Sequence, residues 1–495
     1  MTSSDSSPER SRSADSKVWN ILFLVIVAGS CLTLFFRPLT PEPWQWADDA
    51  LYYKNAIAIS DFLRHPSLQW LGSFNSLVLA KPPLFPLFVA FAYKIGLPLR
   101  LAEWFLFLPL PFLLRLALRP IDLSPRLTLC LGGFWFLSIP AIGIETRLLR
   151  SVLYGALLLY ALIFFSGYAI RQFRQRSNAA IWIGFSAFSG GLASVTREEG
   201  LWIFLPITCG IVAITVARRL KLLAVVSSAM LAIVAYLIPY EAVSLLNWRS
   251  YGVFSPSLRQ NSAFRDLVNL LSSLEPDFRL KYVPIITDTR VRVYDVSPAF
   301  RELRPYLEGP ALDHIATSEP HHRLNSYLGK REFFVSNFDL ALAHAIFLAG
   351  NSTGAEFIDF CSKAANEIRN AVREGKIKAG PKGFGFLPPL TMEKLPLIAS
   401  AALRSGVLLF RVSALKIQQA SVPPMQPEVI SWFAVTRTWP STGTRHHVSK
   451  FFFSAMVIIL QLFYSIGICF FLITVFVAVK RKLIVRDEDL LIVCR

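Results

Sequence analysis

The sequence predicts a polytopic α-helical membrane protein with about eight transmembrane helices, or nine as an alternative, and one extracytoplasmic domain of α or α/β type. Of the 495 residues, 54% are hydrophobic and only 17% are charged, whereas soluble domains usually contain about a quarter charged residues. Several apolar runs approach the roughly 20 residues that a helix needs to cross a bilayer. Basic residues gather in the short connections between these runs.

Membrane topology explains most of the formal charge of +18. The basic clusters lie in connections that we expect to face the cytoplasm, and cytoplasmic loops are rich in Lys and Arg. We therefore expect membrane lipids and no nucleic acid as partners. The clusters are Arg115, Arg119 and Arg126; Arg171, Arg174 and Arg176; Arg218, Arg219 and Lys221; and Lys480, Arg481 and Lys482.

If these connections face the cytoplasm, successive apolar runs cross the membrane in alternating directions. Residues 1–17 and 480–495 are expected to be cytoplasmic tails, the first of them disordered. The predicted spans are 18–36, 101–118, 127–144, 151–170, 179–195, 201–217, 222–243 and 451–479. The stretch 82–97 is shorter and rich in proline, so we expect a short helix at the outer surface, with a ninth, paired membrane element as the alternative.

This topology leaves four segments on the outer side. The transmembrane core, residues 18–243, contributes the loop 37–82 and the turns 145–150 and 196–200. The fourth segment, residues 244–450, is polar and long enough to form the extracytoplasmic domain.

One helix of this domain is predicted in detail. From Glu356 to Val372 the apolar residues recur at helical spacing, and Gly375 follows as a stop signal.

Candidate functional residues lie in the first outer loop. Asp48 and Asp49 are adjacent acids flanked by Trp and Tyr residues. They are either solvated acids in an aromatic interface belt, or a general base or metal ligand for a substrate delivered from the bilayer. Lys81 precedes two prolines, which restrict the backbone, so it either extends toward the interface or holds a phosphate.

Two stretches of this loop carry a family resemblance. "ADDALYYKNAIAISDFL" followed some thirty residues later by "KPPLFPLFVAFAYKIG" resembles the first outer loop of the GT-C glycosyltransferases, in particular the superfamily of dolichyl-phosphate-mannose-protein mannosyltransferases and aminoarabinose transferases. The turn "VTREEGLWIF", Val195 to Phe204, resembles a later element of bacterial members. The resemblance covers roughly residues 18 to 244 and implies a GT-C-like fold.

The resemblance also implies roles for individual residues. Asp48 matches the catalytic aspartate, Asp49 the second acid and Tyr52 the tyrosine that follows them near the substrate. Lys81 matches the lysine that holds the phosphate of a polyprenyl-linked donor. Arg197 is either a second phosphate contact or an ion-pair partner of a neighbouring glutamate.

One departure from the family pattern concerns the second outer loop. Many relatives place an acid just before the next apolar run, where this sequence has Arg150 and Ser151, with Glu145 upstream. Glu145 either substitutes for that acid or the site lacks it, and Arg147 and Arg150 are then candidate phosphate contacts. Whether a divalent metal ion is a cofactor stays open.

The expected function is transfer of a sugar from a polyprenyl-phosphate-linked donor to an unknown acceptor, at the outer face of a multi-pass protein of a bacterial inner (plasma) membrane. A polytopic transporter is one alternative, although most charges lie at the ends of the apolar runs rather than near mid-bilayer. A membrane-anchored binding or scaffold protein that works through residues 244–450 is the other.

Overall fold

A computed structural model of the chain describes most of the region between residues 48 and 380. The described residues are 48–66, 69–121, 150–174, 178–218, 222–276, 280, 283–316, 332–333, 335–380, 392, 395–397, 399–401 and 434–437. The predicted spans 18–36, 127–144 and 451–479 lie outside these residues.

The described part is mostly helical and contains no named strand, only one isolated bridge between Leu274 and Ala379. The elements up to residue 251 are α2 (Asp48–Phe62), α3 (Leu84–Lys94), α4 (Leu99–Phe107), α5 (Leu110–Leu118), η1 (Arg119–Ile121), α7 (Ser151–Phe173), α8 (Ala179–Ser194), η2 (Glu198–Ile203), α9 (Phe204–Arg218) and α10 (Leu222–Tyr251).

Three helical stretches within the described residues are long and apolar enough to cross a membrane: Leu99–Ile121, Ser151–Phe173 and Leu223–Tyr251. They coincide with three of the predicted spans. Along α10 large apolar side chains such as Leu223, Met230 and Ile238 are exposed, which is typical of a surface that contacts lipid or another apolar partner. The predicted helix within 82–97 is present as α3, which has 11 residues.

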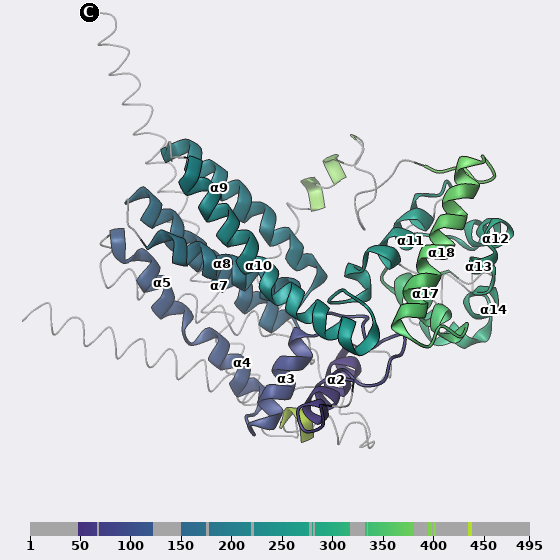
Figure 1. Cartoon of the computed structure of the whole chain (residues 1–495), viewed down its shortest axis with the longest axis horizontal. Coiled ribbons are helices and arrows are strands. Elements are labelled where there is room, and N and C mark those ends of the chain that lie inside the picture. The colour runs from purple at the N-terminus through teal and green to yellow at the C-terminus, as the bar shows by residue number, and fades with distance from the viewer. Residues whose placement is uncertain are drawn as a thin grey trace, which may run out of the picture.

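Helices α4, α5 and α7 to α10 run alongside one another (Figure 1) and share one buried apolar cluster. Small residues allow the closest approach between α8 and α10. A Cβ atom on Gly191 would lie 2.2 Å from the carbonyl oxygen of Tyr236, so only glycine fits this position. Close packing through small residues is a common way in which membrane helices associate.

The helices after residue 251 form a separate group at one end of this bundle (Figure 1). They are η3 (Leu258–Gln260), α11 (Ser262–Ser273), α12 (Thr287–Val296), α13 (Pro298–Arg301), α14 (Arg304–Leu307), η4 (Pro310–Leu312), α15 (Asp313–Ala316), α17 (Val335–Leu348) and α18 (Gly354–Arg373). We call this group the outer domain. The helix predicted from Glu356 to Val372 is confirmed as α18, and Gly375 follows it with a φ of 73°.

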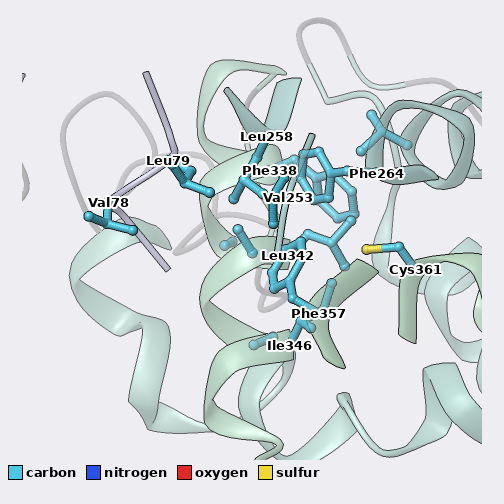
Figure 2. Close-up of a cluster of buried hydrophobic side chains, with 14 of the residues drawn as sticks. Val78, Leu79, Val253, Leu258, Phe264, Phe338, Leu342, Ile346, Phe357 and Cys361 are labelled. Atoms are coloured by element: carbon cyan, nitrogen blue, oxygen red, sulfur yellow. The ribbon is translucent and has the colours of Figure 1, made fainter. Parts of the chain in front are cut away.

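The outer domain and the first loop share one hydrophobic core. Val78 and Leu79 from the loop belong to the same buried cluster as Leu258, Phe338 and Phe357 of the outer domain (Figure 2). The two parts are therefore packed together rather than joined by a flexible linker.

The end of α10 also holds the first loop in place. The indole of Trp70 donates to Asn247 Oδ1 at 2.9 Å, and the Asn247 amide donates to the carbonyls of Ser255 at 2.6 Å and Pro256 at 3.2 Å. One turn further, the Tyr251 hydroxyl donates to Gly72 O at 2.8 Å. Helix α10 continues past Val243, the predicted end of the span, and its last two turns connect the core to the outer domain.

Candidate functional site

The C-terminal end of α8 organises the candidate site, because three separate segments bond to it. The last carbonyls of a helix have no partner within the helix and must find one elsewhere. The amide of Leu84 donates to Val195 O at 3.1 Å, and the Gln260 side chain donates to Ser194 O at 3.0 Å. The guanidinium of Arg150 donates to the next carbonyl, Thr196 O, at 3.3 Å.

The starts of α2 and α3 lie beside each other, next to the C-terminal end of α8. Asp48 and Asp49 are the first two residues of α2, and Lys81 comes three residues before α3 begins at Leu84. One turn after Asp48, the ring of Tyr52 packs edge-on against Phe85 with a centroid distance of 5.2 Å. The turn of α2 that carries the acids is therefore close to the segment that carries Lys81.

A buried ion pair joins the start of α7 to the turn after α8. Arg150 Nη1 lies 2.9 Å from Glu198 Oε2, and both side chains are largely buried. The other carboxylate oxygen of Glu198 is buried and has no hydrogen-bond partner among the described residues. The guanidinium of Arg197 lies over the ring of Tyr154, 5.3 Å from its centroid, which is a cation–π arrangement.

The outer domain adds a second ion pair to the same place. Arg259 Nε in η3 lies 3.1 Å from Asp339 Oδ2 in α17. Burial raises the pKa of Asp339 above its ordinary value; the charges of Arg259 and Lys81 oppose this effect, and Glu198 reinforces it. Asp339 thus interacts electrostatically with residues of both the outer domain and the core. We call Lys81, Arg150, Arg197 and Arg259 the cation cluster.

The structure describes some of the site residues predicted from the sequence, and others lie outside the described residues. Lys81, Arg150 and Arg197 belong to the cation cluster, half-buried or buried. Tyr52 is fully buried, with its ring against Phe85. Glu145 and Arg147 lie outside the described residues.

Two residues of this site, Arg259 and Asp339, were missed by reasoning from the sequence. The signal for Asp339 was present, because it is the acid in the run "FDLALAHAIFL", which is apolar apart from Asp339 and His344. A buried carboxylate in such a run needs a charged or hydrogen-bonding partner. Arg259 has no comparable signal, because the stretch "SPSLRQN" is an ordinary polar turn.

Among the side chains that the structure describes, no group of three or more His, Cys, Asp or Glu residues is arranged to hold a metal ion. The chain matches no protein-family model, and no curated protein or solved structure is measurably similar to it.

Proposed function

We propose that this protein is a GT-C-like glycosyltransferase that moves a sugar from a polyprenyl-phosphate-linked donor to an acceptor on the outer face of the membrane. The observation that carries the proposal is the juxtaposition of the acid-bearing start of α2 with the Lys81 segment, next to three arginines. A sugar phosphate donor needs both kinds of group close together.

The chemistry assigns each kind of group a task. Glycosyl transfer passes through an oxocarbenium-like transition state while the bond to the phosphate oxygen breaks. Asp48 would accept the proton of the acceptor hydroxyl or amine as that group attacks the anomeric carbon. The cation cluster would stabilise the negative charge that develops on the departing phosphate. Asp49 would contribute on the acceptor side, and the buried ring of Tyr52 would hold the start of α2 against Phe85.

The second outer loop lacks the acid that the family pattern places near Arg150, but the fold brings another acid to this position. Where Arg150 stands in place of the expected acid, Glu198 lies 2.9 Å from it. An acid therefore accompanies this position, although it comes from the turn after α8. This supports a site of the proposed type without requiring Glu145.

The proposal includes the finer topology. We propose that the three long helices are joined in the membrane by α8 and α9, and by the spans predicted at 18–36, 127–144 and 451–479. Helix α8 has 16 residues, which is about 24 Å, so the adjoining turn would complete its crossing. The outer domain would then lie on the extracytoplasmic side, over the site.

The test compares wild type with Asp48→Asn and Lys81→Ala in purified, folded form. Radiolabelled polyprenyl-phosphate sugars serve as donors, and a membrane extract serves as the pool of acceptors. We expect Asp48→Asn to lose transfer by roughly 10²-fold or more with donor binding intact, because the base is removed. We expect Lys81→Ala to lose donor binding.

Each variant has a matched control on its own element. Asp61→Asn lies near the end of α2 and Lys94→Ala near the end of α3, and both side chains are exposed. Both controls should transfer sugar at the rate of the wild type. Normal transfer by Asp48→Asn and Lys81→Ala, or no transfer by the wild type from any lipid donor, would contradict the proposal and favour the transporter or scaffold alternatives.

A further inference from the structure

Asp339 occupies an unusual position for a carboxylate. Its side chain is only 9% exposed and lies against Arg259, which is 19% exposed. The residues that precede the two partners, Phe338 and Leu258, are both in the buried cluster that joins the outer domain to the first loop (Figure 2). The ion pair is thus held at the contact between the two parts of the molecule.

The cation cluster is the kind of group that holds an anionic ligand. Two of its members form ion pairs with buried carboxylates, Arg150 with Glu198 and Arg259 with Asp339. Glu198 is paired with Arg150 within the core. Asp339 is the acid whose charge acts on both Arg259 and Lys81.

We propose that the carboxylate of Asp339 is the resident counter-ion of Arg259 and Lys81, and that the phosphodiester of the lipid-linked donor competes with it for these two cations. This inference rests on the proposed function for the identity of the ligand. Asp339 is then a positioning residue: it keeps the two cations in place before the donor arrives and weakens donor binding while it is ionised.

Competition of this kind makes donor binding depend on pH. The charged groups that act on Asp339 come from three other elements: Arg259 of η3, Lys81 before α3 and Glu198 of η2. Its own helix adds His344, which is hydrogen-bonded to Ser76 at 2.6 Å. The pKa of Asp339 lies above its ordinary value because the side chain is buried. As the pH falls through that raised pKa, the carboxylate takes up a proton, stops competing, and anion affinity rises.

The experiment measures binding of a prenyl methyl phosphodiester to the full-length protein in detergent, from about pH 8 to about pH 5. This probe keeps a single negative charge over the whole range, so the ligand itself does not titrate. We expect the wild type to bind more tightly as the pH falls. Asp339→Asn should bind about fivefold or more tightly than wild type at the higher pH and show a flatter pH profile.

Three further samples separate competition from a structural effect. Asp339→Glu should restore the pH dependence, and Asp359→Asn, the same change at an exposed position of α18, should behave like wild type. Phosphatidylglycerol tests the other lipid phosphodiester; displacement of the probe with equal affinity would overturn the donor as the ligand. If the asparagine variant does not fold, the wild-type pH profile decides, and a flat profile overturns the inference.

The inference and the proposed function fail in different ways. Weaker or unchanged binding by folded Asp339→Asn, in a protein that still transfers sugar, overturns the inference alone. If the wild type transfers no sugar while Asp339→Asn binds the probe more tightly, the proposed function fails and the counter-ion role of Asp339 stands.

Discussion

At the scale of single residues, the turn that carries Arg197 depends on a glycine. The amide of Gly200 donates to Arg197 O at 2.9 Å, which closes the turn after α8. A Cβ atom at Gly200 would lie 2.4 Å from both the Cα and the N atoms of Ser194. These are backbone atoms, so a side chain at this position would push the turn away from the end of α8.

Gly200→Ala is therefore expected to displace Arg197 and Glu198 and to weaken binding of the prenyl phosphodiester. It should also lower the Tm, because the segments that are hydrogen-bonded to the C-terminal end of α8 must shift. The control is Gly184→Ala within α8, where a Cβ atom would lie 3.7 Å from the side chain of Leu231, an ordinary contact. That variant should be neutral or stabilised by up to about 1 kcal/mol, because alanine is the better helix former. Equal behaviour of the two variants would contradict this account.

The residues of the site were only partly predictable from the sequence. Lys81 could be selected because it precedes two prolines, and Arg150 because it stands where an acid was expected. The Arg259–Asp339 pair could not, because its partners are far apart in the chain and meet only through tertiary packing. The same is true of Arg171, which we assigned to a cytoplasmic cluster. It is buried and donates to the carbonyls of Leu116, Ala117 and Gly167.

At the scale of elements, α18 shows how local sequence signals define a helix. Thr353 and Glu356 form a capping box, in which the Glu356 amide donates to Thr353 Oγ1 at 3.3 Å and the Thr353 amide donates to Glu356 Oε2 at 3.0 Å. At the other end, Gly375 N donates to Val372 O and Lys376 N to Ala371 O, a Schellman arrangement.

Thr353→Ala is expected to destabilise the outer domain by about 1 kcal/mol, the usual cost of losing an N-cap. The hydrogen bonds from Thr353 hold the pKa of Glu356 below its ordinary value. Since that folded-state pKa is lowered, the stabilising effect of Glu356 is present above the ordinary glutamate pKa and is lost as the pH falls through the folded value.

The measurement is the unfolding of wild type and Thr353→Ala followed at neutral and at acidic pH. The difference between the two proteins should shrink at the acidic end. Ser362→Ala within α18 gives a matched removal of a hydroxyl without removing this capping box. A difference that stays constant over the whole pH range would argue against the capping box as its source.

The helices themselves followed from the sequence more closely than the site did. The apolar runs predicted at 151–170 and 222–243 appear as α7 and α10, because membrane-length apolar runs have few alternatives to helix. The end of α10 was predicted too early. Asn247 lies beyond the predicted end, yet it is buried and hydrogen-bonded to two other segments. Its partners could not be inferred from local composition.

At the scale of the whole molecule, Asn247 is where the core, the first loop and the outer domain meet. Its side chain accepts from Trp70 and donates to Ser255 and Pro256. Asn247→Ala would leave the buried indole N–H and two carbonyls without these partners. Each such orphaned group costs about 1–3 kcal/mol.

We therefore expect Asn247→Ala to lower the Tm clearly and to weaken phosphodiester binding, because the loop that leads to Lys81 loses its attachment to α10. Asn370→Ala makes the same substitution at an exposed position of α18 and should leave both quantities near the wild-type values. Thermal unfolding and probe binding in the same detergent check both effects. Unchanged binding in Asn247→Ala would show that the loop keeps its position without this contact.

The shared core between the first loop and the outer domain also has a consequence for biosynthesis. Trp70 and its partner Asn247 are 177 residues apart in the chain. At about 5–20 residues per second, the ribosome needs roughly 10 to 35 s to produce the second after the first. Val78 and Leu79, fully buried in the finished protein, wait even longer for Phe338 and Phe357. The nascent chain thus passes through an interval in which the apolar side chains of its first loop lack the partners that bury them, and this interval ends only when α17 and α18 have been translated.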